Sequence, residues 1–447
     1  MVTFLGAPAR RRCGFLAPAG GVQGVGCGKR ARGVADVKPI GVAPGVRRKA
    51  SAFALGAVLL LVAACGGGGG GDSASGDHKA PPGASAPATT DTVASTAVVT
   101  IAPEDGADGV ATTGALKVGA TGGKLSSVVV KDDKGTVVPG DISADGTGWT
   151  PSGHLDTSTQ YTVDATAKDA AGRESDKHAT FTTVTPKDTF VGYFTPEDGS
   201  TVGVGMEVYL RFSRPISNKK AVEDGVRVSA APSVPVAAKW NGSQELYIRP
   251  ADYWTPGTKV TLSLDLKGVE GAPGVYGKQQ KSVHFTIGRR QVSIVDASKH
   301  TMTVYRDNKA VRTIPISAGG PTHTTYNGKM VISEKYVTTR MNGDTVGFGG
   351  EYDIKDVPHA MRLTTSGTFI HGNYWAGPSV FGHSNTSHGC VGLHDVRGAH
   401  DPDTPAAWFY NSSMIGDVVE VVHSKDKTVQ WYNGLNGWNL SWNDWTA

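Results

Sequence analysis

The sequence has no uninterrupted run of 18 or more apolar residues, which excludes a protein with several transmembrane helices. It also has no heptad or short helical repeat, so a coiled coil and an α-helical solenoid are excluded. Only 19% of the 447 residues are charged, and only four are cysteine. Glycine is abundant, and many short Val- and Thr-rich runs lie between Gly, Asp and Asn residues. This pattern predicts a mainly β protein.

The net positive charge of the chain arises from its N-terminal part. The formal net charge is +4, but residues 1–49 contain ten Lys and Arg residues and one acidic residue. The remaining residues therefore carry about −5, which gives no electrostatic basis for binding a polyanion. We expect no nucleic-acid partner.

Residues 46–64 have the features of a signal peptide. Basic residues at 47–49 precede an apolar stretch of about 14 residues, which is too short to span a membrane core of about 30 Å. The sequence V-A-A-C that ends at Cys65 resembles the lipobox of bacterial lipoproteins. The resemblance implies an extracytoplasmic protein anchored to the outer face of the cell membrane by a lipid on Cys65. An ordinary cleaved signal with a chance cysteine is the alternative.

Two further segments flank this signal. Residues 1–45 resemble neither a signal nor a domain, and we interpret them as the result of a start site assigned too far upstream. Residues 65–97 are almost entirely small and polar, so they cannot bury enough apolar surface to fold. We predict a flexible linker that spans roughly 30 Å on average and lifts the folded part toward the cell wall.

The segments 98–185 and 186–288 are similar to each other. The sequence P-E-D-G at 103–106 recurs at 196–199, and each segment closes on a strand that contains Phe-Thr. A Pro-containing opening turn and about seven short strands in each segment predict two Ig-like β-sandwiches. Neither segment contains a catalytic constellation, so we interpret both as spacers or wall-binding modules.

The segment 289–424 is predicted to be a β-rich domain with one short helix. Its expected strands are 292–296, 301–305, 310–317, 329–338, 367–371 and 416–422, and its expected helix is 404–414. The Gly-, Thr- and Asn-rich segment 318–350 is predicted to form a lid or a wall of the substrate site. Residues 425–447 hold four of the nine Trp residues and are predicted to form a C-terminal subdomain that packs back onto a domain.

The residues that can carry chemistry cluster between 359 and 400. This stretch holds six of the 13 His residues and Cys390, which has no disulfide partner in the exported part of the chain. A thiolate is a strong nucleophile, and a nearby imidazole can take its proton. Gly389 permits a tight turn in which backbone N–H groups bind an oxyanion. Spacing alone does not choose the base, since His388 would share a strand face with Cys390.

His371-Gly372 followed by Ser387-His388-Gly389-Cys390 resembles the signature of the L,D-transpeptidases, which have a YkuD-type catalytic domain. The resemblance covers about 290–447, and the two Ig-like modules and the Trp-rich tail are similar to the arrangement of large actinobacterial members.

This resemblance implies the roles of several residues. Cys390 would be the acyl-accepting nucleophile and His371 its base, with the Gly372 carbonyl orienting the imidazole. The Gly389 and Cys390 N–H groups would lie near the oxyanion, and His388 would shape the pocket. Substrate contacts are implied for Tyr352, Met341, Ser387 and Trp375.

The implied reaction is acyl transfer in two steps. The thiolate attacks the carbonyl of a diamino acid in a peptidoglycan tetrapeptide stem and expels D-Ala. An amine of a neighbouring stem then resolves the thioester to a 3→3 cross-link. The resemblance implies no metal and no organic cofactor, and we expect a monomer.

One position departs from the family pattern. The family usually has Asn or Arg two residues after the cysteine, whereas this chain has Gly392. A substrate contact would then be lost, or supplied by His394 or Asp395. We interpret His383, His394 and His400 as solvated or hydrogen-bonded loop residues.

The sequence leaves four other functions open. They are an L,D-carboxypeptidase, another cell-wall cysteine peptidase, a non-catalytic wall-binding lipoprotein, and a zinc hydrolase. The zinc hydrolase would use N and S ligands from His371, His383, His388 and Cys390.

Overall fold

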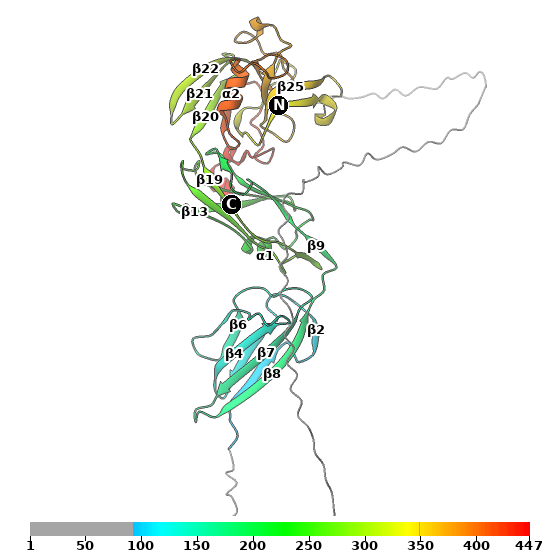
Figure 1. Cartoon of the computed structure of the whole chain (residues 1–447), viewed down its shortest axis with the longest axis vertical. Coiled ribbons are helices and arrows are strands. Elements are labelled where there is room, and N and C mark those ends of the chain that lie inside the picture. The colour runs from blue at the N-terminus through cyan, green and yellow to red at the C-terminus, as the bar shows by residue number, and fades with distance from the viewer. Residues whose placement is uncertain (1–92, 348) are drawn as a thin grey trace, which may run out of the picture. The chain divides into compact units, whose positions relative to one another are not determined.

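The computed structural model describes residues 93–347 and 349–447. The predictions for residues 1–45 and 46–64, for Cys65 and for most of the linker lie outside the described residues. The described chain is mainly β, with two sandwiches followed by a third β-rich part, which confirms the predicted fold class (Figure 1). None of the helices in the described residues combines the length and the apolar character needed to cross a membrane.

The first sandwich consists of two four-stranded sheets, of order β1-β3-β6-β5 and β2-β8-β7-β4. Every second residue of β7 is buried, which is the period of a strand with one face on a core. Trp149, Tyr161 and Phe181 lie in that core. The strands are β1 (Val98–Ala102), β2 (Ala107–Val110), β3 (Lys117–Thr121), β4 (Lys124–Asp132), β5 (Gly140–Ile142), β6 (Gly148–Pro151), β7 (Gln160–Lys168) and β8 (Glu174–Thr183).

The second sandwich has more strands than the seven expected. Two four-stranded sheets, β10-β12-β15-β14 and β11-β19-β16-β13, enclose its core, and a small sheet β17-β18-β9 and the helix α1 (Lys219–Asp224) are added to them. The strands are β9 (Asp188–Phe190), β10 (Gly192–Thr195), β11 (Thr201–Val202), β12 (Val208–Phe212), β13 (Val226–Ala231), β14 (Val236–Asn241), β15 (Glu245–Pro250), β16 (Lys259–Asp265), β17 (Glu270–Ala272), β18 (Val275–Gly277) and β19 (Gln280–Ile287).

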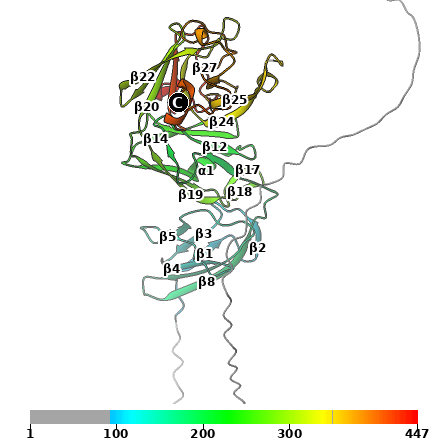
Figure 2. The same ribbon diagram turned by 45° about the horizontal axis from the view of Figure 1, so that its top comes forward.

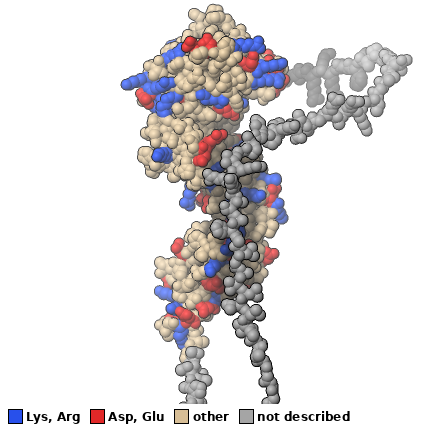
Figure 3. Space-filling view, viewed as in Figure 1, with Lys and Arg blue, Asp and Glu red and all other residues tan. Residues whose placement is uncertain are grey.

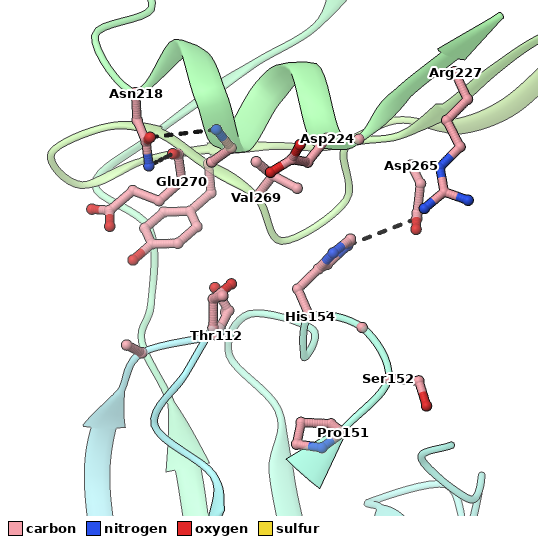
Figure 4. A pocket seen from close by; sticks show the side chains of 16 residues that line it. Thr112, Pro151, Ser152, His154, Asn218, Asp224, Arg227, Asp265, Val269 and Glu270 are labelled. Carbon is pink, nitrogen blue, oxygen red and sulfur yellow. Dashed lines mark hydrogen bonds and ion pairs between the residues drawn. The ribbon is translucent and has the colours of Figure 1, made fainter. Parts of the chain in front are cut away.

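Side chains of the two sandwiches meet around a cavity of about 480 Å³ (Figure 4). The buried Thr112 hydroxyl donates a hydrogen bond to the Gly268 carbonyl (2.8 Å), and His154 lies 3.7 Å from the carboxylate of Asp265. The sandwiches are therefore joined by direct contacts as well as by the chain.

The third part is built on a nine-stranded sheet of order β23-β28-β20-β21-β22-β27-β26-β25-β24 (Figure 2). Its strands are β20 (Gln291–Asp296), β21 (Thr301–Arg306), β22 (Lys309–Ser317), β23 (Gly328–Val331), β24 (Glu334–Asn342), β25 (Asp353–Arg362), β26 (Phe369–Asn373), β27 (Val391–His394) and β28 (Val418–Val422).

The single strand predicted at 329–338 is wrong. The chain pairs with β28 through β23, and after the buried Ile332 it pairs with β25 through β24. The break follows from the change of partner, since the Ile332 N–H bonds to Asp417 and the Ser333 N–H bonds to Arg362. The segment 328–342 therefore supplies both edge strands of the nine-stranded sheet, β23 and β24.

The predicted helix at 404–414 is observed as α2 (Pro405–Ser412). The Thr404 hydroxyl caps its first turn by accepting from the Ala407 N–H (3.2 Å), and Pro405 occupies a position where no N–H is needed. The helix ends before Met414 because the Met414 N–H donates to the carboxylate of Asp417 (2.9 Å).

The Trp-rich tail packs into the core of the second sandwich. Trp438 and Trp445 are buried among its apolar residues. The Trp438 indole N–H donates to the Gly205 carbonyl (2.7 Å), and the Trp445 indole N–H donates to the Ala237 carbonyl (3.0 Å). The tail includes η3 (Gly437–Asn439) and α3 (Trp442–Thr446).

Arg249 of β15 is enclosed by the tail and is 1% exposed. Its guanidinium lies 4.8, 5.6 and 4.4 Å from the ring centres of Trp438, Trp442 and Trp445. Its Nη2 also donates to tail carbonyls, at 3.1 Å to Gly437 and at 3.0 Å to Leu440. The three rings and both acceptors of Nη2 therefore belong to the last 11 residues of the chain, while Nη1 donates to the carbonyls of Pro250 (3.0 Å) and Ala251 (3.3 Å).

The same tail contacts the third part of the chain. The Asn436 amide oxygen accepts from the Val331 N–H (3.0 Å), and the Asn439 side chain makes two hydrogen bonds to the backbone of Lys329. Gly203 and Gly416 meet so closely that a Cβ on Gly203 would lie 2.3 Å from the Asp417 nitrogen. The second sandwich and the third part thus share a close-packed junction.

The exposed surface has mixed charge. On the face drawn in Figure 3, Lys and Arg side chains are interspersed with Asp and Glu side chains over the described residues.

We predict that Arg249→Ala destabilises the second sandwich by about 3–5 kcal/mol, because tail carbonyls lose their donor and the three indoles lose the enclosed cation. The measurement is guanidinium unfolding followed by Trp fluorescence. Arg211→Ala, which removes an exposed Arg of β12, is the control and should change the unfolding free energy by no more than about 0.5 kcal/mol. Equal effects of the two substitutions would contradict the assignment.

Candidate active site

The parallel pairing of β26 with β27 brings the two parts of the sequence motif together. His371 lies opposite Gly392, and Ile370 lies opposite Val391. Cys390 directly precedes β27, so its side chain lies beside the strand that carries His371. Seventeen residues lie between His371 and Gly389 in the sequence, and the pairing of β26 with β27 brings their segments side by side.

A tight turn presents Cys390. Gly389 has φ +106°, a backbone conformation that L side chains rarely adopt, so the residue before the cysteine is suited to glycine. The Ser387 hydroxyl donates to the Cys390 carbonyl (2.6 Å) and accepts from the Gly389 N–H (3.2 Å). Within the described residues, no hydrogen bond uses the Cys390 N–H, which leaves it available to a substrate oxygen.

The Cys390 thiol is partly buried and is held by backbone groups. The Phe369 N–H donates to the sulfur (3.4 Å), and the thiol lies 3.7 Å from the Gly367 carbonyl as donor. Burial raises the pKa of the thiol to about 11. Among the described residues the thiol makes no hydrogen bond to His371. The cysteine is therefore a neutral thiol at neutral pH in this structure.

His371 is 5% exposed and is held by its own strand. Its Nδ1 lies 2.8 Å from the Gly372 carbonyl, which can only accept, so Nδ1 carries the proton and Nε2 is the basic nitrogen. Burial lowers the pKa of His371. The indole of Trp375 stacks on the imidazole at 5.7 Å between ring centres. The residue is thus a neutral imidazole of fixed tautomer.

A buried carboxylate supports this strand from behind. Asp395 lies 2.8 Å from Nδ1 of His359 and accepts from the Thr404 hydroxyl (2.9 Å). A Cβ on Gly372 would lie 1.9 Å from the Asp395 carboxylate, so only glycine fits at this position of β26. The expectation that Asp395 contacts substrate is therefore wrong, because its side chain is fully buried in this network.

The space beside Gly392 is filled by Asn373. A Cβ on Gly392 would lie 3.4 Å from Nδ2 of Asn373, whereas His394 lies against Phe381, with ring centres 5.7 Å apart. The Asn373 amide oxygen accepts from the N–H groups of Trp375 (3.2 Å) and Ala376 (3.0 Å), and the residue lines the cavity. Asn373, and not His394, thus occupies the position where the family usually has a longer side chain.

One cavity of about 240 Å³ joins the predicted site residues. The hairpin of β24 and β25, with the 3₁₀ helix η1 (Gly343–Val346) between them, provides its outer wall. It contains residues 334–350 of the segment predicted to form a lid or wall, whereas β23 in the same segment pairs with β28. The predicted residues that line the cavity are Met341, Tyr352, His371, Trp375, Ser387, His388 and Cys390. Gly389 and Gly372 adjoin it through the backbone.

Sequence reasoning missed four lining residues, Ile354, Asn373, Ala376 and Thr386. Asn373 was detectable in principle, because it lies two residues after His371 and two residues along a strand share a face. Ile354 has no such signal, since its place depends on how the lid hairpin folds back.

The four predicted zinc ligands do not converge. Within the described residues, the one group of three or more His, Cys, Asp or Glu side chains with metal-binding spacing is His323, Glu351 and His388. It excludes His371, His383 and Cys390, so the ligand set proposed for a zinc hydrolase is wrong. The group lies at the mouth of the cavity through His388.

Two family models match the chain. A bacterial Ig domain matches residues 107–270, which reach across both sandwiches, and the L,D-transpeptidase catalytic domain named YkuD matches residues 290–421. The second match contains every predicted catalytic residue.

Similar proteins cover most of the chain. L,D-transpeptidase 2 of Mycobacterium tuberculosis (strain CDC 1551 / Oshkosh) is 32% identical over 352 residues, which are 78% of this chain and 84% of the relative. L,D-transpeptidase 5 of Mycobacterium tuberculosis (strain ATCC 25618 / H37Rv) is 31% identical over 78% of this chain and 76% of the relative. A solved L,D-transpeptidase from Mycobacterium smegmatis is 26% identical, with a TM-score of 0.41 over 52% of this chain and 97% of that chain. The extent and identity of the sequence matches show that the chain belongs to the L,D-transpeptidase family of enzymes.

Proposed function

We propose that the chain forms 3→3 cross-links in peptidoglycan through a thioester on Cys390. The observation that carries this proposal is that the Cys390 thiol and the neutral imidazole of His371 line one cavity. Membership in the L,D-transpeptidase family supports the substrate class. Other cavity residues are suited to hold an extended peptide, since they combine aromatic rings with hydroxyl and amide groups.

In the first step, the Cys390 sulfur bonds to the carbonyl carbon of the diamino acid in a tetrapeptide stem. Nε2 of His371 takes the thiol proton as the S–C bond forms, because Nδ1 is already bonded to Gly372. The C–N bond to D-Ala then breaks, and the proton passes from His371 to the departing amine. The products are free D-Ala and an acyl thioester.

In the second step, an amine of a neighbouring stem attacks the thioester carbonyl. His371 takes a proton from that amine and returns it to the sulfur as the S–C bond breaks. The Cys390 N–H is available to stabilise the oxyanion in both steps, and Gly389 can contribute once its N–H leaves Ser387. Water in place of the amine would give an L,D-carboxypeptidase.

The remaining cavity residues are proposed to bind the stem. Met341 and Tyr352 of the lid face the donor peptide, while Trp375 packs on the imidazole and limits its rotation. Ser387 holds the turn that presents the nucleophile. His388, whose ring lies 5.2 Å from that of Tyr352, shapes the opening.

The two sandwiches are proposed as spacers between the membrane and the wall. In this proposal the chain is a monomer, a lipid on Cys65 anchors it to the outer face of the membrane, and the linker and sandwiches carry the catalytic part outward. Cys390 remains the one free thiol in the described residues.

The proposal predicts D-Ala release from a disaccharide-tetrapeptide, with a 3→3 dimer as second product, by mass spectrometry. Cys390→Ala should abolish both products, since no nucleophile remains. The matched control His383→Ala removes an exposed histidine outside the cavity and should retain both. Release of D-Ala without a dimer, in the presence of acceptor, would favour a carboxypeptidase, and no reaction by a folded protein would exclude the proposed activity.

The raised pKa of Cys390 predicts a pH dependence of alkylation. The reactive thiolate fraction grows about tenfold per pH unit below a pKa of about 11. The rate of iodoacetamide labelling should therefore rise roughly 100-fold between pH 7 and pH 9, whereas a small thiol of ordinary pKa levels off just above pH 8.5. A rate that is already constant near pH 7 would instead indicate a preformed thiolate and imidazolium pair.

Asn373 is predicted to supply the contact that Gly392 lacks. Asn373→Ala should lower kcat/KM by roughly 5–30-fold, mainly through KM, because one hydrogen bond to substrate is lost. The double variant Asn373→Gly with Gly392→Asn should recover part of the loss, since the first change frees the space the second fills. An unchanged kcat/KM in Asn373→Ala would show that the amide does not contact the substrate.

A further inference from the structure

Three side chains from separate segments converge at the mouth of the cavity. His323 comes from the loop between β22 and β23, Glu351 from the lid just before β25, and His388 from the turn that presents Cys390. Glu351 Oε2 lies 3.1 Å from Nε2 of His388 and 3.7 Å from Nε2 of His323. We propose that these residues form a zinc site that closes the lid over the active site.

The separations of the ligand atoms fit a tetrahedral ion. Zinc binds imidazole nitrogen and carboxylate oxygen at about 2.0–2.2 Å, so neighbouring ligand atoms lie about 3.4 Å apart around it. The two nitrogen–oxygen distances fall on either side of that value, and all three atoms lie within 4.8 Å of one another. Small side-chain rotations are sufficient to seat the ion, and a water molecule completes the fourth position.

The chemistry of the group selects zinc over the common hard cations. Two imidazoles and one carboxylate suit borderline metals, whereas Mg²⁺ and Ca²⁺ prefer all-oxygen sites. The side chains of His323, Glu351 and His388 are 26%, 47% and 37% exposed, so an ion in solution can reach them. An ordinary ion pair would need only one histidine, whereas here two rings lie 5.0 Å apart and both have Nε2 within 3.7 Å of one carboxylate oxygen.

The location of the site gives zinc a way to control access. Glu351 is adjacent to Tyr352 on the lid, and His388 is two residues from Cys390. The ring of Tyr352 already lies 5.2 Å from that of His388, and both residues line the cavity. An ion bound to Glu351 and His388 ties the lid to the catalytic turn and narrows the opening. This inhibitory effect rests on the proposed function, while zinc binding does not.

The test is Zn²⁺ binding to the full chain by equilibrium dialysis with metal analysis. We expect one Zn²⁺ per chain, and Co²⁺ in its place should give the visible absorption of a four-coordinate ion. His323→Ala and Glu351→Gln should each weaken binding at least tenfold, and Glu351→Gln keeps the shape of its side chain. His383→Ala, the matched control, should bind as the unaltered chain does, as should Cys390→Ala.

Several results would overturn the proposal. Loss of binding in Cys390→Ala, with full binding in His323→Ala and Glu351→Gln, would place the ion on the thiol. Absence of binding by the folded chain would exclude the site. Zinc should also slow D-Ala release by the unaltered chain, reversibly with a chelator, and should slow the Glu351→Gln chain far less. Binding without slowing would overturn lid closure alone, whereas no D-Ala release even without zinc would refute the proposed function and leave the site tested by binding.

Discussion

The active site depends on the parallel pairing of β26 with β27. These strands are separated by a loop of 17 residues, yet their pairing sets His371 opposite Gly392, next to the turn that carries Cys390. A shift of one residue in this register would turn His371 to the other face of the sheet. The residues around the pair protect the register, because Asp395 is packed against Gly372 and is held by His359 and Thr404. The buried network of Asp395, His359 and Thr404 thus helps to hold the position of His371 from outside the cavity.

Burial favours the uncharged forms of Cys390 and His371, the proposed catalytic pair. It raises the pKa of Cys390 and lowers the pKa of His371, so both shifts favour a neutral thiol beside a neutral imidazole. The proton would then move from the thiol to the imidazole only when a substrate carbonyl is bound. The oxyanion that forms would accept a hydrogen bond from the Cys390 N–H. A resting thiol of this kind is less open to oxidation than a thiolate, and the described residues contain no second cysteine to pair with it.

The sequence carried the fold class, the two sandwiches and the family, because these depend on local strand patterns and on a short motif of specific chemistry. It also supplied the residues that line the cavity on both motif segments. It could not reveal Asn373 as the neighbour of Gly392, because that contact exists only after two strands pair. The same reason explains the error at 329–338, where one apolar run serves two partners. The burial of Asp395 likewise depends on His359 and Thr404, which are distant in the sequence.

The tail has a consequence for the order in which the protein matures. The core of the second sandwich is complete only with Trp438 and Trp445, and Arg249 finds its three indole rings and the acceptors of its Nη2 in residues 437–445. Because a chain is synthesised from its N-terminus, this sandwich stays unfinished until the last residues are available. The third part of the chain depends on the same residues, because Asn436 and Asn439 bond to the backbone of its strand β23. Completion of the second sandwich and of the nine-stranded sheet is thus tied to release of the whole polypeptide from the ribosome.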